Sequence, residues 1–389
     1  MYNQVISSCL SAMRKDDFMR NDLIRLLSQK NPELLVNYID NLNSRRFSLV
    51  TLVDTLSPLL VMESNLTFGS FHLIKMSLFL RQMSHRGLLS RETEIALAKV
   101  IVQHLYYLEW TMLDVSSHAH APDPIEQPVD HMLIEIEQGN AHNAFFYASI
   151  ALQSDKAKLL NTLLLNGTTS VPDTLGHSIS CFFPVLQDLV DMDHPAAGTA
   201  LLSYIMYLCR YRQKSLPENQ ANQKLTDPDK AALLRQAASG TSIVDIHHMI
   251  TLYIYRAWEK AAWQTGDPLP WRLFSDWMGH KAVDQSRLDQ AARSDTVELP
   301  GNYEQLRQIF SEKNEQSTIT AALSLLANNW QQACDWLFRI YADSYTPDWD
   351  PHYITSLYAA LELYCDESID KTSSKMAIIQ ALSYYIENI

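Results

Sequence analysis

The chain contains one string that could form a hydrolase nucleophile and several histidines that could hold a metal. Residues 176–180 read GHSIS, which matches four of the five positions of the G-x-S-x-G nucleophile elbow. The fifth position is Ser180, whereas the elbow needs glycine because strand and helix approach closely there. The preceding SVPDT indicates a loop. Ser178 is therefore predicted to be a polar residue in the first turn of a helix, and His177 becomes the residue of interest.

Other histidines lie in segments that read as helices. His142 is in GNAHNAFFYASIAL, His247 and His248 are in VDIHHMITLYIYRAW, and His352 is in DPHYITSLYAALELY. Neutral imidazoles from separate helices that face a bundle interior can form a nitrogen-rich metal site with open positions. The alternative for His177 and His248 is a buried, hydrogen-bonded histidine without metal. For His352, which follows Asp-Pro, the alternative is a capping-region side chain on a surface turn.

Helical periodicity predicts the elements that carry these residues. Apolar positions recur every three or four residues within 23–42 and again from 91 to 113. A further helix is predicted from His177 to Leu189, with Pro184 kinking or breaking it. The sequence lacks long alternating runs and Asn-Gly hairpin signals. It has only 10 glycines, against roughly 27 at an average usage of about 7%. The prediction is an all-α, multi-helix, bundle-like fold.

Polar and proline-rich segments predict the organisation of the chain. The first such segment is VSSHAHAPDPIEQP, residues 115–128. It predicts an N-terminal helical region (1–115), a linker (116–130) and a large helical domain (131–389). Two further loops are predicted at 215–230 and 265–302. Four tryptophans could line a pocket for a flat ligand or could simply pack in the core; they are Trp258, Trp263, Trp271 and Trp277.

Composition excludes several classes of partner. The net charge is −13, with 31 basic and 44 acidic residues, which argues against nucleic acid. No run of 18 uncharged apolar residues occurs, so no membrane span is expected. Five scattered cysteines without a C-x-x-C pair favour a reducing, cytoplasmic location. Neither G-x-G-x-x-G nor G-x-x-x-x-G-K is present, so no nucleotide cofactor is expected.

The order of the histidine-bearing segments resembles the questin oxidase-like family over roughly residues 131–370. The helix that starts at His177 is followed by an alanine- and aromatic-rich segment, 193–217, that ends in a Leu-Pro loop. Three further segments each match a short motif of the family. The matching residues are Asn143 with Ala151-Leu152, His248 with Thr251, and Asp350 with His352 and Ile354. The family's other motif positions hold Ala144 and Pro184 in place of histidines and Thr355 in place of a lysine.

The resemblance implies a helical oxidoreductase that uses oxygen to oxidise aromatic polyketides such as anthraquinones. It implies iron held by His177, His248 and His352, with His142 or His247 as replacements for the missing histidines. The expected function is therefore a metal-assisted oxygenase of a small aromatic molecule. The alternative is a catalytically degenerate relative that uses the same helical cavity to bind a ligand or a protein. The discriminating observation is whether the histidines converge.

Overall fold

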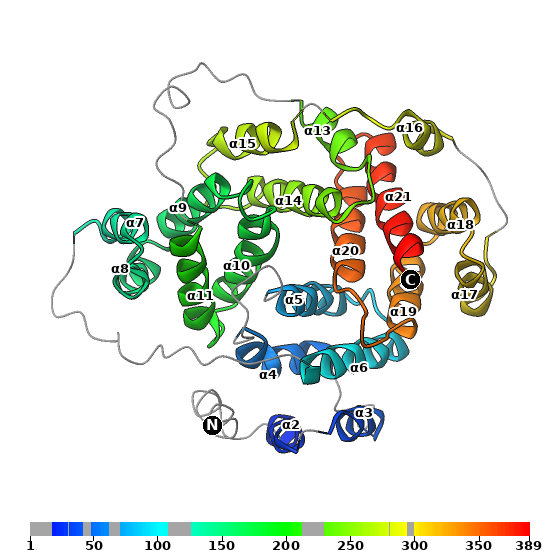
Figure 1. The fold of residues 1–389 in the computed structure, drawn as a ribbon. Coiled ribbons are helices and arrows are strands. Elements are labelled where there is room, and N and C mark those ends of the chain that lie inside the picture. Colours follow the sequence, from blue (N-terminus) through cyan, green and yellow to red (C-terminus); the bar gives the residue numbers. More distant parts are fainter. Residues whose placement is uncertain are drawn as a thin grey trace.

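The computed structural model describes residues 18–29, 31–41, 48–61, 71–107, 126–211, 229–279, 281–293 and 299–389. These residues form helices and no strand, which confirms the predicted all-α class (Figure 1). The first half contains α2 (Phe18–Ser28), α3 (Pro32–Asn41), α4 (Leu49–Val61), α5 (His72–His85), α6 (Arg91–Tyr107), α7 (Pro128–Gln138), α8 (Ala141–Ser154), α9 (Lys156–Thr169), the π-helix η2 (Ser178–Phe182), α10 (Phe183–Asp191) and α11 (Ala197–Arg210). The second half contains α13 (Lys230–Ala237), α14 (Ile243–Glu259), α15 (Leu269–Met278), α16 (Gln285–Ala292), α17 (Tyr303–Ser311), α18 (Glu315–Asn328), α19 (Trp330–Asp343), α20 (His352–Cys365) and α21 (Lys371–Asn388).

Four elements from distant parts of the chain form a closed ring at the centre of the molecule. α5 packs against α20, α20 against α14, α14 against η2, and η2 back against α5. In Figure 1, α5 lies near the middle of the molecule, with α14 and α20 beside it. The first nine residues of α5 are all buried, and they include the polar residues His72, Lys75 and Ser77. This ring positions the candidate site.

Local hydrogen bonds fix where two of the ring helices begin. Ser242 and Asp245 form a capping box at the start of α14, in which each side chain accepts a hydrogen bond from the other residue's backbone N–H. At the start of α20, Asp350 accepts a hydrogen bond of 2.9 Å from the backbone N–H of His352, with Pro351 at the N-cap. Histidines near these starts therefore enter the ring at defined positions.

The remaining helices cover the ring. On one side α7, α8, α9 and α11 pack together, and on another α16, α18, α19 and α21 do so. α4 and α6 from the N-terminal region pack against α5, and α6 also contacts α19. The N-terminal region thus supplies one wall of the ring. The division of the chain at residues 115 and 130 stays a prediction; residues 108–125 lie outside the described part, and α7 begins at Pro128.

The prediction of a continuous loop over 265–302 is wrong for two stretches, which form α15 and α16. Pro270 lies in the first turn of α15, and Trp271, Phe274 and Met278 form its buried face. Asp284 caps α16 by accepting hydrogen bonds from two backbone N–H groups. The predicted break at Pro184 coincides with the change from π-helix to α-helix at Phe183. Among the described helices, none combines the length and apolarity required to cross a bilayer.

Candidate metal centre

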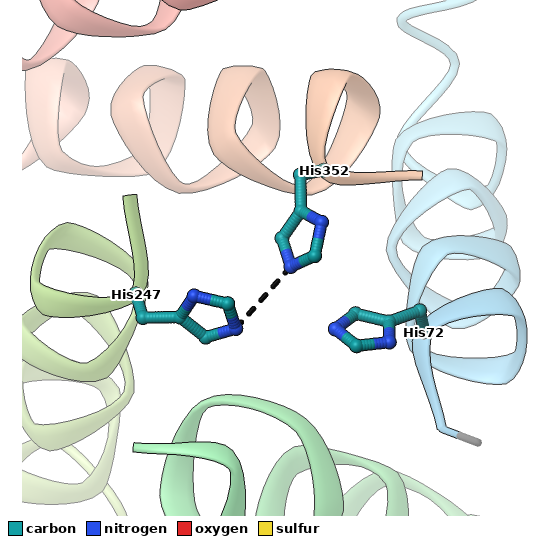
Figure 2. Close-up of side chains that lie close together, drawn as sticks. All are labelled: His72, His247 and His352. Atoms are coloured by element: carbon teal, nitrogen blue, oxygen red, sulfur yellow. Dashed lines mark hydrogen bonds between the residues drawn. The ribbon is translucent and has the colours of Figure 1, made fainter. Parts of the chain in front are cut away.

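Four buried histidines meet inside the ring, one from each element. His72 begins α5, His177 precedes η2, His247 lies in the second turn of α14, and His352 begins α20. These four residues are between 1% and 7% exposed. Ligand atoms of His72, His247 and His352 all lie within 4.8 Å of one another. Figure 2 shows a ring nitrogen of each of these three side chains directed toward a common centre.

A tight turn between α9 and η2 places His177. Leu175 and Gly176 both have positive φ, 49° and 75°, and a side chain at Gly176 would clash with Trp277, whose ring comes within 2.6 Å of the Cβ position. Glycine at this position therefore satisfies both the backbone conformation and the close packing. Ser178, the next hydroxyl, is buried and donates to the carbonyl of Gly167 at 2.7 Å.

The other ring nitrogen of three histidines is held by a hydrogen-bond acceptor. Nδ1 of His177 lies 2.7 Å from the carbonyl of Thr174, and Nδ1 of His247 lies 2.8 Å from the carbonyl of Ile243. Nδ1 of His352 lies 2.7 Å from a carboxylate oxygen of Asp350. A carbonyl or an ionised carboxylate can only accept, so each Nδ1 carries the proton.

In neutral imidazoles, a proton on Nδ1 leaves Nε2 as a lone-pair donor. Nε2 of His247 lies 3.2 Å from Nε2 of His177 and 3.2 Å from Nε2 of His352. Two lone pairs at that distance repel unless a cation lies between them. Two imidazole nitrogens that share one ion at about 2.0–2.1 Å are separated by roughly 3.0–3.4 Å when the angle at the ion is tetrahedral or somewhat smaller. The observed spacing fits a metal centre.

Burial disfavours the alternative in which a proton takes the place of the cation. It lowers the pKa of His72 and of His247 well below the usual value, and the charges of the neighbouring histidines and of Lys75 lower both further. Burial alone would raise the pKa of Asp350, but the charge of His352 and the hydrogen bonds from His352 and Tyr384 hold it below its usual range. Burial thus keeps His72 and His247 neutral, and the Asp350 carboxylate is ionised. This cluster could bind a metal ion.

The structure brings three of the five sequence-derived candidates together. His177, His247 and His352 belong to the cluster, and His248 and His142 do not. His248 is buried with its ring edge-on to Trp277, 4.2 Å between centroids, and Nδ1 lies 3.8 Å from Asp245. Burial, reinforced by the charge of Lys281, lowers the pKa of His248 to about 4. His142 is exposed on α8, a helix that packs against α7, α9 and α11.

The structure also places the three residues that differ from the family motifs, Ala144, Pro184 and Thr355. Ala144 is buried on α8 and Pro184 lies in the first turn of α10. Thr355 is buried on α20, one turn after His352. The tryptophans pack around α14 and α15: Trp258 donates to Asn161 at 3.2 Å and Trp271 donates to Glu259 at 2.9 Å. This packing corresponds to the core alternative for these two tryptophans.

His72 is the cluster residue that sequence reasoning missed. The segment FHLIKMSLFL contains a histidine and a lysine one turn apart among apolar residues. Two titratable groups on a helix that is otherwise apolar are the signal that could have identified it, because burying such groups is costly unless they have a partner or a role.

Comparison of the chain with protein-family models, curated proteins and solved structures finds no match. The resemblance to questin oxidase-like proteins therefore rests on the short motifs, and the cluster rests on its own geometry.

Proposed function

We propose that this protein is a metal-dependent oxidoreductase, an oxygenase that acts on an aromatic or polyketide-like small molecule with iron as its metal. The observation that carries the metal-binding half is the convergence of the Nε2 lone pairs of His177, His247 and His352, with His72 opposite. The oxygenase half is supported by the motif resemblance. Iron would supply the oxygen chemistry that amino-acid side chains lack.

The donor set favours a transition metal over magnesium or calcium. Imidazole nitrogens suit iron, copper, nickel and zinc, whereas magnesium and calcium prefer oxygen ligands. The Asp350 carboxylate and the two carbonyls hold the imidazoles in the tautomer that ligation requires, a role typical of residues behind metal ligands. Iron is the choice within this group because of the resemblance.

Metal content of the purified, untagged protein tests the first half. Replacement of His247 by alanine removes the central imidazole and should abolish near-stoichiometric metal uptake. His248→Ala is a matched control, because it is the neighbouring buried histidine of the same helix and lies outside the cluster. Equal metal content in both variants would contradict the assignment of the cluster. Elemental analysis also decides between iron and zinc.

Oxygen consumption tests the second half. The iron-loaded protein should consume oxygen in the presence of a hydroxylated anthraquinone or simpler phenol from a panel, and His247→Ala should not. Stoichiometric metal without oxygen consumption across the panel would favour the alternative, a helical binding module in which the metal centre is structural.

A further inference from the structure

The distances between the rings of the four cluster histidines show how these side chains surround their common centre. Neighbouring ring centroids lie 4.3 Å apart for His72 and His352, 4.7 Å for His352 and His247, 4.3 Å for His247 and His177, and 5.0 Å for His177 and His72. The centroids of His72 and His247 are farther apart, at 6.1 Å. These two histidines therefore lie across the centre from each other.

The packing of the helices explains this arrangement. α20 and η2 each pack against both α5 and α14, so the histidines of α5 and α14 enter the ring from opposite sides. Figure 2 shows the result for three of the side chains: His72 and His247 point toward each other, and His352 enters between them.

The same distances distinguish two ways in which four imidazoles can hold one ion. In a tetrahedral set every pair of ligands makes the same angle at the ion, so all the ring separations are alike. In a set with right angles, as in octahedral or square-planar coordination, opposite ligands are farther apart than neighbouring ones. The cluster matches the second arrangement, because the separation between His72 and His247 exceeds each of the neighbouring separations.

The nitrogen positions allow His72 and His247 to share one ion. Two imidazole nitrogens on opposite sides of an ion, each at about 2.0–2.1 Å, are roughly 4.0–4.2 Å apart. Ligand atoms of His72, His247 and His352 lie within 4.8 Å of one another, and this limit includes that separation. Nε2 of His247 lies 3.2 Å from Nε2 of each of its neighbours, His177 and His352.

The geometry also bears on which metal fits. Zinc that is held by four side chains is almost always tetrahedral. Copper(II) and nickel(II) accept square or tetragonal sets of nitrogen ligands, and non-haem iron(II) sites keep open positions beside their protein ligands. An arrangement with right angles therefore favours these metals over zinc.

We propose that all four imidazoles hold one transition-metal ion at right angles, with His72 opposite His247, and that the ion is six-coordinate. Its two remaining positions take small ligands such as water or azide. The inference rests on the metal-binding half of the proposed function. It adds as a ligand His72, which lies outside the residues that resemble the questin oxidase-like family, and it favours iron over zinc on geometry alone.

Cobalt(II) is the probe for the geometry, because tetrahedral cobalt(II) absorbs visible light far more strongly than six-coordinate cobalt(II). Full-length protein titrated with cobalt(II) without oxygen should bind it near-stoichiometrically and absorb weakly. Saturating azide should change the spectrum, since positions remain for small ligands. An intense tetrahedral spectrum would overturn the proposal, and a spectrum unchanged by azide would overturn the assignment of open positions.

Replacement of His72 tests its place among the ligands. His72→Ala should weaken cobalt binding by more than the about 10–100-fold that is typical of residues behind the ligands. Electron paramagnetic resonance of the copper(II)-loaded parent should show coupling to four nitrogens, and that of His72→Ala coupling to three. Unchanged affinity together with four coupled nitrogens in His72→Ala would exclude His72 as a ligand.

Two further variants serve as controls. His248→Ala should match the parent in affinity and in both spectra, because His248 is a buried histidine that packs on Trp277, outside the cluster. His72→Gln provides the same test if the alanine variant does not fold, and thermal unfolding without metal identifies that case.

Oxygen consumption by the iron-loaded protein separates this inference from the proposed function. Six-coordinate cobalt bound by four nitrogens, in a protein whose iron form consumes no oxygen, would support the inference while the oxygenase proposal fails. A tetrahedral cobalt spectrum in a protein whose iron form consumes oxygen would overturn the inference and leave the proposed function in place.

Discussion

At the scale of single residues, Asp350 connects the histidine cluster to α21. One oxygen of its carboxylate accepts from both the backbone and the ring of His352, and the other accepts from the hydroxyl of Tyr384 on α21. The carboxylate thereby fixes the orientation of one imidazole and the position of the proton on its ring. We therefore expect Asp350 to influence metal affinity by positioning the imidazole of His352.

Asp350→Ala should weaken metal binding about 10–100-fold, the usual effect of removing a carboxylate behind a ligating histidine. The measurement is a competition titration of metal against a chromophoric chelator. Tyr384→Phe serves as control, because it removes a hydrogen bond to the same carboxylate and leaves the contact with His352 in place. An effect of Tyr384→Phe as large as that of Asp350→Ala would indicate a structural role for the carboxylate.

At the scale of elements, the turn between α9 and η2 sets the place of His177. Gly176→Ala would put a methyl group 2.6 Å from Trp277 and 3.0 Å from Thr251, on a backbone with φ of 75°. We expect a loss of about 1–3 kcal/mol in the free energy of unfolding, together with weaker metal binding. Gly198→Ala is the control, since nothing lies within 4 Å of its Cβ position and it sits in α11.

Urea unfolding followed by circular dichroism measures both variants, and metal titration follows on each. A Gly176→Ala variant as stable as Gly198→Ala would mean that Trp277 and the turn readily adjust, and that this turn does not hold His177 rigidly.

The sequence predicted the elements of the site better than the site itself. Periodicity identified the all-α class, and Pro184 marked a change of helix type, because both depend on local spacing. α15 and α16 were missed, since proline and polar residues obscure short helices that begin with them. His247 and His248 are consecutive helical residues, so their side chains point about 100° apart. Only the packing of α14 against the neighbouring helices decides which of the two joins the cluster. The residues around His72 could have marked it as a candidate, but its partners in the cluster depend on the packing of α5 against α20, which local sequence does not contain.

At the scale of the whole molecule, a half-buried chain of polar side chains joins three helices. Gln82 on α5 donates to Asp188 on α10 at 2.7 Å and accepts from the hydroxyl of Tyr358 on α20. Burial raises the pKa of Asp188 to about 7, and the charge of Asp191 adds to the rise, while the hydrogen bond from Gln82 and the charge of Arg81 oppose it. Between the ordinary aspartate pKa and about pH 7, this carboxyl group is therefore protonated in the folded protein and ionised in the unfolded chain.

This difference gives stability a defined dependence on pH. The contribution of Asp188 is complete below the ordinary aspartate pKa and is lost as pH rises through about 7. The side chain at position 188 in the Asp188→Asn variant stays neutral at every pH. The free energy of unfolding of this variant should rise relative to that of the parent by more than about 1 kcal/mol between pH 5 and pH 7.5. Above pH 7.5 the difference in unfolding free energy should stay constant. Chemical denaturation across this range measures it; a difference that does not vary with pH would refute the raised pKa.

The closed ring also has a consequence for the order of events during synthesis. Its four histidines extend from His72 to His352 along the sequence, so α20 is made long after α5. The ring cannot close until the ribosome has released α20, so metal capture would be a late step. An ion bound there would link segments that are far apart in the sequence and would offset the entropy cost of closing that long loop. This stabilisation would become available only after α20 has been synthesised.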